Sequence, residues 1–253
     1  MDQLEYHLSS EKILGKTISI IKKYFNKNSV GNYLDIGSGN GTLVELVKRV
    51  SPNLKPHCVD YTDELLRNKD IPLSVVDLNI EKLPYENNFF DLITCTEVVE
   101  HLENYRLIIR ESYRVAKPNA RIVFTTPNIL NLNSRLRYLQ FGFHSLFGPL
   151  TVDREEAFST GGHITPVSYF YLAHSLLEAG YREVKVEFDK KQSSSYFWLL
   201  LLYPVIATMC FFTTRRETKK KTINSTNNFI VSELNTIDML LGRTIVVSAV
   251  KPS

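Results

Sequence analysis

Residues 33–41, YLDIGSGNG, decide the fold of this 253-residue chain. An apolar run enters a turn that holds Gly37, Gly39 and Gly41, and an apolar pattern typical of a helix follows at 42–50. Glycine permits tight backbone conformations and lets a ligand approach closely. Because the turn opens a helix, free N–H groups and the positive end of the helix dipole face that ligand. The stretch therefore predicts a strand, a nucleotide-like ligand and a helix.

Acidic residues around the turn narrow the choice of ligand. The glycines are spaced Gly-x-Gly-x-Gly, whereas a dinucleotide-binding turn has the spacing Gly-x-Gly-x-x-Gly. Asp35 stands at the entry to the turn, where a carboxylate suits an ammonium group better than a pyrophosphate. Asp60 ends the next apolar strand, and a carboxylate there can accept hydrogen bonds from both ribose hydroxyls.

The pattern Asp-x-Gly-x-Gly-x-Gly resembles motif I of the class I S-adenosylmethionine (SAM) methyltransferases. The resemblance continues through Asp60, through Asp77 after a third strand, and into residues 89–95, FFDLITC. It implies that Asp35 and the glycine turn hold the methionine part of SAM, and that Asp60 holds the ribose. Asp77 and the Leu78 backbone would lie against the adenine. The alternatives are a glycine turn in another kind of α/β protein and an NAD-dependent enzyme.

Strand and helix patterns alternate along the chain, which implies parallel strands with helices on both faces of a sheet. The methyltransferase fold adds an antiparallel strand pair at one edge. We therefore expect a single α/β domain over 1–253, with a doubly wound, Rossmann-like sheet of six parallel strands and one antiparallel edge strand. The expected strands are 33–36, 56–60, 73–77, 90–95, 120–126, 183–189 and 243–251, and the expected helices 9–25, 41–50, 62–68, 103–116 and 166–179.

Composition indicates a globular protein of a reducing compartment. Hydrophobic residues make up 43% of the chain and charged residues 23%, which are ordinary values. The three cysteines lie far apart and form no Cys-x-x-Cys pair. The first residues show no basic-then-apolar signal pattern. We expect a cytoplasmic protein that is soluble or bound to the cytoplasmic face of a membrane.

Two carboxylates and an imidazole follow the fourth strand, in the segment 96–103, TEVVEHLE. On a helical turn Glu97, Glu100 and His101 are spaced i, i+3 and i+4, so their side chains would share one face. Such a group suits Mg²⁺, Mn²⁺ or Zn²⁺, and His163 offers a fourth ligand. Glu-x-x-Glu-His with a later His resembles the ubiquinone-biosynthesis O-methyltransferases and the small-RNA 3′-end 2′-O-methyltransferases.

The same residues allow chemistry without a metal. Segments like EVVEHL are widespread in class I methyltransferases, where Glu97 would only contact the cofactor. His101 or His163 would then be the general base, since an imidazole titrates near working pH. His163 is equally compatible with a helix-capping or core histidine.

Two segments exceed the minimal fold. Residues 129–162 mix apolar, aromatic and basic side chains, which predicts an amphipathic lid over the substrate pocket; the alternative is a surface loop without a role. Residues 190–241 lie inside the edge hairpin and contain the uncharged stretch 196–212.

Basic residues flank this stretch, with Glu217 as the only acid between 190 and 221, so the rest of the chain is net acidic. Pro204 favours a kink or a re-entrant hairpin over a straight span. We expect 190–241 to dock on a membrane surface without crossing it. The alternative is a helix buried against the lid or in a dimer.

These patterns predict a SAM-dependent methyltransferase that acts on oxygen. The expected acceptor is a small, lipid-linked, quinone-like or glycan-derived molecule at a membrane. An RNA ribose 2′-O-methyltransferase is the main alternative, but the net acidic main domain argues against a nucleic-acid partner. A SAM-binding scaffold protein without turnover is another. The pattern does not fix the oligomeric state.

Overall fold

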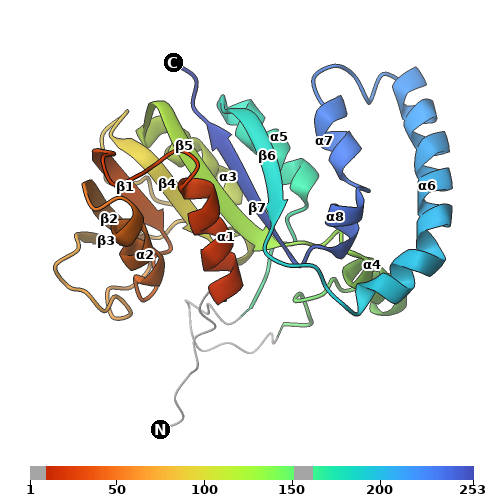
Figure 1. Ribbon diagram of the computed structural model, residues 1–253, viewed down its shortest axis with the longest axis horizontal. Helices are drawn as coiled ribbons and strands as arrows, with labels where there is room; N and C mark the ends of the chain where they lie inside the picture. The colour runs from red at the N-terminus through yellow and green to blue at the C-terminus, as the bar shows by residue number, and fades with distance from the viewer. Residues whose placement is uncertain (1–9, 151–161) are drawn as a thin grey trace, which may run out of the picture.

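Seven strands form one sheet in the order β3-β2-β1-β4-β5-β7-β6, in a computed structural model that describes residues 10–150 and 162–253 (Figure 1). Strands β1 to β5 are parallel, whereas β7 is antiparallel to both β5 and the edge strand β6. This arrangement confirms the predicted fold class. The strands are β1 (Gly31–Ile36), β2 (Leu54–Asp60), β3 (Leu73–Val75), β4 (Phe90–Thr96), β5 (Ala116–Pro127), β6 (Arg182–Phe188) and β7 (Thr244–Val250).

Helices cover both faces of the sheet, because its strands bury apolar side chains on both sides. Along β1 the side chains alternate: Leu34 and Ile36 join one core cluster, and Tyr33 joins the other. α1 and α2 pack on the Tyr33 face, and α3 and α5 on the opposite face. The helices are α1 (Glu11–Ile21), α2 (Thr42–Val50), the 3₁₀ turn η1 (Val99–His101), α3 (Tyr105–Val115), α4 (Leu132–Phe141), α5 (Tyr169–Ala179), α6 (Ser195–Lys219), α7 (Asn228–Glu233) and α8 (Ile237–Leu241).

The predicted helix at 62–68 is wrong, because this segment is a loop of bends and turns. Its polar side chains bind the nearby backbone instead. The Thr62 hydroxyl accepts a hydrogen bond from the Glu64 N–H at 3.3 Å, and Asn68 Oδ1 accepts one from the Asp70 N–H at 3.1 Å. Such local bonds compete with helix formation. β2 and β3 are therefore joined by a loop at the edge where the glycine turn lies.

The second insertion holds three helices between β6 and β7. An isolated bridge between Lys191 and Gly242 closes its base at the carboxyl edge of the parallel strands. From there α6 runs alongside α8 and α7, which lead the chain back to the sheet (Figure 1). α6 continues through Pro204 as one helix that bends along its course (Figure 1), so the re-entrant hairpin is wrong and the alternative of a kinked helix holds. Proline removes one backbone hydrogen bond, and a 25-residue helix tolerates that loss.

The first insertion, 129–162, contains α4 and the turns that follow it to residue 150. Its last part, 151–161, lies outside the described residues. The Asn133 amide on α4 donates to the Ser194 hydroxyl at 2.9 Å, just before α6 begins. The two insertions therefore meet at the same edge of the sheet.

Candidate cofactor and catalytic site

The glycine turn between β1 and α2 adopts a conformation that favours glycine at three positions. Gly37, Gly39 and Gly41 have φ values of 70°, 50° and 79°, all left-handed. A Cβ on Gly37 would overlap the Val98 side chain, and one on Gly41 would lie 2.7 Å from Leu66 Cδ1. The turn therefore has no room for a side chain at these two positions, which fits a backbone that receives a ligand at the start of α2.

Asp35 lies on β1, in the interior of the protein, directly before this turn. Its side chain is buried, and Oδ1 accepts a hydrogen bond from the Thr94 hydroxyl at 2.6 Å. The Tyr33 hydroxyl lies 2.7 Å from the same Thr94 oxygen. Burial raises the pKa of Asp35 from 3.8 to about 7, although the bond from Thr94 opposes the rise. A cation beside Asp35 would restore its charge, so this carboxylate fits the ammonium end of SAM.

Asp60 links the end of β2 to the glycine turn. Its Oδ2 accepts the Gly39 N–H at 2.7 Å, and its Oδ1 accepts the Tyr61 N–H at 2.8 Å. The side chain is buried, and burial raises the pKa of Asp60 against the effect of these bonds. Each carboxylate oxygen has a second lone pair that can accept a bond from a ribose hydroxyl. Asp60 therefore positions the turn and is also available to a nucleoside.

Asp77 lies two residues after β3 and forms a turn. Its Oδ1 accepts the Asn79 N–H at 2.9 Å, and its carbonyl oxygen accepts the Glu81 N–H at 2.9 Å. Leu78 is buried in the core cluster that also contains Leu34. These contacts give both residues a structural role, and their predicted contact with adenine stays a prediction.

Glu97 does not share a helical face with Glu100 and His101, which corrects the sequence-based expectation. The helical turn η1 begins only at Val99, and Glu97 leaves β4 with a left-handed φ of 56°. The Thr125 hydroxyl accepts the Glu97 N–H at 3.0 Å and donates to Glu97 Oε1 at 2.9 Å. Left-handed backbone is uncommon for residues with a side chain and is concentrated at functional sites.

Glu100, His101 and His163 come together, with their ligand atoms all within 4.8 Å of one another. Backbone bonds between two distant segments bring them there. The Glu100 carbonyl oxygen accepts the N–H groups of Ile164 and Thr165 at 2.9 and 3.0 Å, so the chain after His163 is attached to η1. Glu97 lies outside this cluster, so three of the four predicted metal ligands are brought together.

The histidine rings are held against each other and against the first insertion. His101 Nδ1 lies 3.1 Å from the Gly162 carbonyl oxygen, and the His101 and His163 ring centroids are 4.8 Å apart at 76°. Phe147, which follows α4, places its ring centroid 5.2 Å from that of His163. The segment 129–150 therefore reaches the histidine cluster.

Burial controls the charges in this cluster. The Glu100 side chain is fully buried, and neither carboxylate oxygen makes a hydrogen bond of good geometry among the described residues. Burial raises the pKa of Glu100 well above its usual value, and the charge of Glu97 raises it further. Burial lowers the pKa of His101. The unliganded cluster therefore favours a neutral imidazole that can accept a proton. One carboxylate and two imidazoles also form a donor set that fits a divalent metal.

Sequence reasoning missed several polar partners of the predicted site residues. Thr94 faces Asp35 because the two are paired in register across β4 and β1. Thr125 on β5 holds Glu97, whose pKa burial raises to about 7, with Asp189 raising it further and Arg243 opposing. Strand register and the return of the edge hairpin create these contacts, and one sequence alone specifies neither.

A methyltransferase-domain family model matches residues 34–124, the segment from β1 into β5. The ubiquinone/menaquinone biosynthesis C-methyltransferase of Pectobacterium carotovorum is 30% identical over 126 residues, 45% of this chain and 49% of that protein. The corresponding Desulfotalea psychrophila protein is 28% identical over 166 residues, 61% of each chain. An uncharacterized protein of Methanocaldococcus jannaschii is 27% identical over 119 residues, covering 51% of it. The chain thus spans only about half of most of these relatives.

Solved structures share the fold across nearly the whole chain. A SAM-dependent methyltransferase from Archaeoglobus fulgidus has a TM-score of 0.57 and 19% identity, with 94% of each chain covered. The Haemonchus contortus phosphoethanolamine N-methyltransferase 2 in complex with SAM has a TM-score of 0.53 and 16% identity, with 94% of this chain and 53% of that chain covered. At these identities the likeness establishes the fold.

Proposed function

We propose that the chain is a class I SAM-dependent methyltransferase and that it transfers the methyl group of SAM to an oxygen of a small, lipid-linked acceptor. The observation that carries the proposal is one edge of the sheet, where the glycine turn, Asp35 and Asp60 lie together with η1. A quinone-like or glycan-derived hydroxyl is the acceptor class that suits the neighbouring histidines.

The cofactor part of the proposal rests on charge and backbone. When bound, SAM supplies an electrophilic methyl group on a sulfonium sulfur. Asp35 would pair with its ammonium group, because burial leaves that carboxylate without a cation among the described residues. Asp60 would accept the ribose hydroxyls while it holds the Gly39 N–H. These contacts fix the cofactor in one orientation, and positioning supplies much of the rate of such transfers.

The acceptor hydroxyl must lose its proton as the methyl group arrives. His101 is the group best placed to take that proton, since burial lowers its pKa and keeps the imidazole neutral. The hydrogen bond with the Gly162 carbonyl favours a proton on Nδ1 and leaves Nε2 as the accepting atom. His163 lies against the His101 ring and confines it.

A divalent metal is the second way in which this cluster can activate a hydroxyl. Glu100, His101 and His163 would hold the ion, which lowers the pKa of a bound hydroxyl. Support comes from the two buried carboxylate oxygens of Glu100, which lack hydrogen bonds of good geometry. Glu97 would not bind the ion, and its negative charge would act on the nearby Glu100 carboxylate.

Methylation of carbon is a candidate because relatives at about 30% identity carry the name C-methyltransferase. A base at the acceptor would serve both outcomes, because methylation of a ring carbon also requires the loss of a proton. The two outcomes give different products: a methyl ether or a methyl group bonded to a ring carbon.

The test is a methyl-transfer assay with purified protein and isotope-labelled SAM. One arm contains a membrane lipid extract as the acceptor, and the other contains total RNA. We expect label in the lipid fraction, as a methyl ether by NMR. His101→Ala should lower the rate by about 100-fold or more. His174→Ala, an exposed histidine on α5, is the matched control and should not change it. Label in RNA, or on carbon, would refute the proposed acceptor chemistry.

A further inference from the structure

α6 presents an apolar surface that nothing in the described chain covers. Its most apolar 18-residue window has a mean hydropathy of 1.8, and 0% of that window is buried. No charged residue occurs between 196 and 212. Soluble monomers rarely expose continuous apolar patches of this kind, so a partner is expected. The exposed large side chains are Tyr196, Phe197, Leu200, Leu201, Tyr203, Val205, Met209, Phe211 and Phe212.

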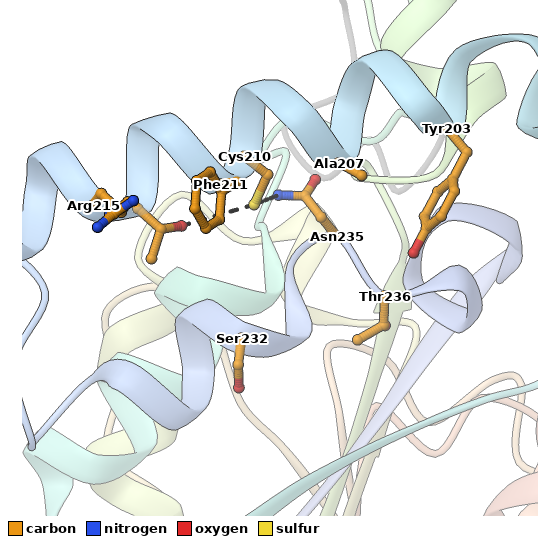
Figure 2. A pocket seen from close by; sticks show the side chains of 9 residues that line it. Tyr203, Ala207, Cys210, Phe211, Arg215, Ser232, Asn235 and Thr236 are labelled. Atoms are coloured by element: carbon orange, nitrogen blue, oxygen red, sulfur yellow. Dashed lines mark hydrogen bonds between the residues drawn. The ribbon is translucent and has the colours of Figure 1, made fainter.

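The inner side of α6 is not packed as a core helix either. A groove of about 560 Å³ separates α6 from α7 and α8, as Figure 2 shows. Across it, the Asn235 amide reaches Cys210 Sγ at 3.3 Å. Length and composition alone would let α6 cross a membrane. The path of the chain beyond the helix decides whether it does so.

That path brings the chain back along the protein. α7 packs on α5 and buries Ile230, and α8 buries Met239 and Leu241 in the body of the protein. The Gln192 N–H donates to the Leu241 carbonyl oxygen at 2.9 Å, which joins the two ends of the insertion. Folded protein therefore lies beside α6 along its length (Figure 1), and a bilayer core cannot surround the helix. Only an orientation parallel to the membrane surface keeps these contacts.

Charge identifies the kind of surface. Five exposed basic side chains lie at the end of α6 and just beyond it: Arg215, Arg216, Lys219, Lys220 and Lys221. Glu217 is the one acidic residue among them. Basic clusters next to apolar surface bind anionic headgroups. At the other end of the helix, Tyr196 and Trp198 are residue types that favour the membrane–water interface.

α4 extends this surface toward the cofactor edge of the sheet. Leu139 and Phe141 on α4 are 82% and 60% exposed, and Asn133 attaches α4 to the start of α6. We infer that α6 and α4 together form a docking surface for an anionic membrane, with α6 lying in the interface and not across the bilayer. The docking surface does not require the proposed reaction, although a lipid-linked acceptor would reach the site from the same side.

Trp198 provides a direct measurement, because it is the only tryptophan of the chain and lies in α6. The full-length protein is titrated with vesicles of phosphatidylcholine, with and without phosphatidylglycerol. We expect a blue shift of Trp198 emission with the anionic vesicles, quenching by lipids brominated on the acyl chains, and weaker binding as salt rises. Anionic vesicles that cause no shift and no co-sedimentation would overturn the inference.

Variants distinguish binding through this docking surface from non-specific adsorption to vesicles. Leu200→Glu combined with Met209→Glu places charge on exposed positions, and should weaken vesicle binding by about tenfold or more. Val30→Glu is the matched control, since Val30 is 75% exposed on the body of the protein. S-adenosylhomocysteine binding should be unchanged in both. Unchanged vesicle binding by the double variant would refute the inference.

A dimer is the competing occupant of this surface. Light scattering of the detergent-free protein decides between the two, because a dimer that buries α6 would make Trp198 insensitive to vesicles. The double variant would then become monomeric, and that result would overturn membrane docking. If the native protein transfers methyl groups but does not bind vesicles, this inference fails and the proposed function stands. If it binds vesicles but transfers no methyl group, the proposed function fails and this inference stands.

Discussion

Asp35→Asn should stabilise the free protein at neutral and higher pH, even though it removes a site residue. Asp35 is buried, no cation pairs with it among residues 10–150 and 162–253, and burial raises its pKa from 3.8 to about 7. Its contribution to stability is therefore fully present below about pH 4, and it is lost as pH rises through 7. At about 1.4 kcal/mol per pKa unit, the ionised carboxylate destabilises the folded state by about 4 kcal/mol at pH 8.

Asparagine has no proton to lose and can still accept the hydrogen bond from Thr94. The stability advantage of Asp35→Asn over the native chain should therefore grow by about 3 kcal/mol between pH 5 and pH 8. Guanidinium unfolding of both proteins at a series of pH values measures this difference. An advantage that stays constant over this range would refute the reasoning, because it would mean that Asp35 titrates with an ordinary pKa.

The same variant should lose the cofactor. A ligand ammonium group favours the ionised form of Asp35, so binding near pH 6 should release a proton from the native chain. Calorimetry in buffers of different ionisation enthalpy detects that proton. Asp35→Asn should release none and should bind S-adenosylhomocysteine at least about tenfold more weakly.

Three further predictions concern the turn, the metal and Asp77. Gly37→Ala should abolish S-adenosylhomocysteine binding in calorimetry and lower the stability of the protein. Gly142→Ala is the control: Gly142 also has a left-handed φ, +74°, but no atom lies close to an added Cβ, so this variant should lose only stability. Equal binding by both variants would contradict this prediction. If Glu100, His101 and His163 hold a divalent ion, EDTA should abolish turnover and Mg²⁺, Mn²⁺ or Zn²⁺ should restore it, with loss of activity in acid as the histidines protonate. Full activity in EDTA would leave His101 as a metal-free base. Asp77→Ala should lower the unfolding free energy by about 1 kcal/mol, since it loses the bond to the Asn79 N–H. A loss of affinity as large as that of Asp60→Ala would instead establish Asp77 as a cofactor ligand.

The glycine turn could be predicted because its signal is local. A strand, a left-handed turn and a helix start are all encoded within residues 33–50, and the strands that follow bury both faces. The predicted helix at 62–68 failed because Thr62 and Asn68 bind their own backbone, and a weak apolar pattern did not reveal that competition.

The histidine cluster was predictable in composition but not in geometry. The approach of His163 to His101 depends on backbone bonds from Ile164 and Thr165 to the Glu100 carbonyl, which join residues far apart in sequence. Glu97 does not lie on the predicted helical face because its φ is left-handed. Nothing in the sequence around a glutamate predicts that conformation. α6 likewise packs on α8 and α4, and these contacts join segments far apart in the sequence.

Binding of S-adenosylhomocysteine, measured by calorimetry on the native chain and on Asp60→Ala, tests the central claim most directly. Asp60 holds the Gly39 N–H and is the predicted ribose ligand, and each lost charge-assisted hydrogen bond is worth about 1.5–3 kcal/mol. We expect one site on the native chain, at least about tenfold weaker binding by the variant, and no competition from NAD. Unchanged affinity in Asp60→Ala, or tight binding of NAD in place of S-adenosylhomocysteine, would contradict it.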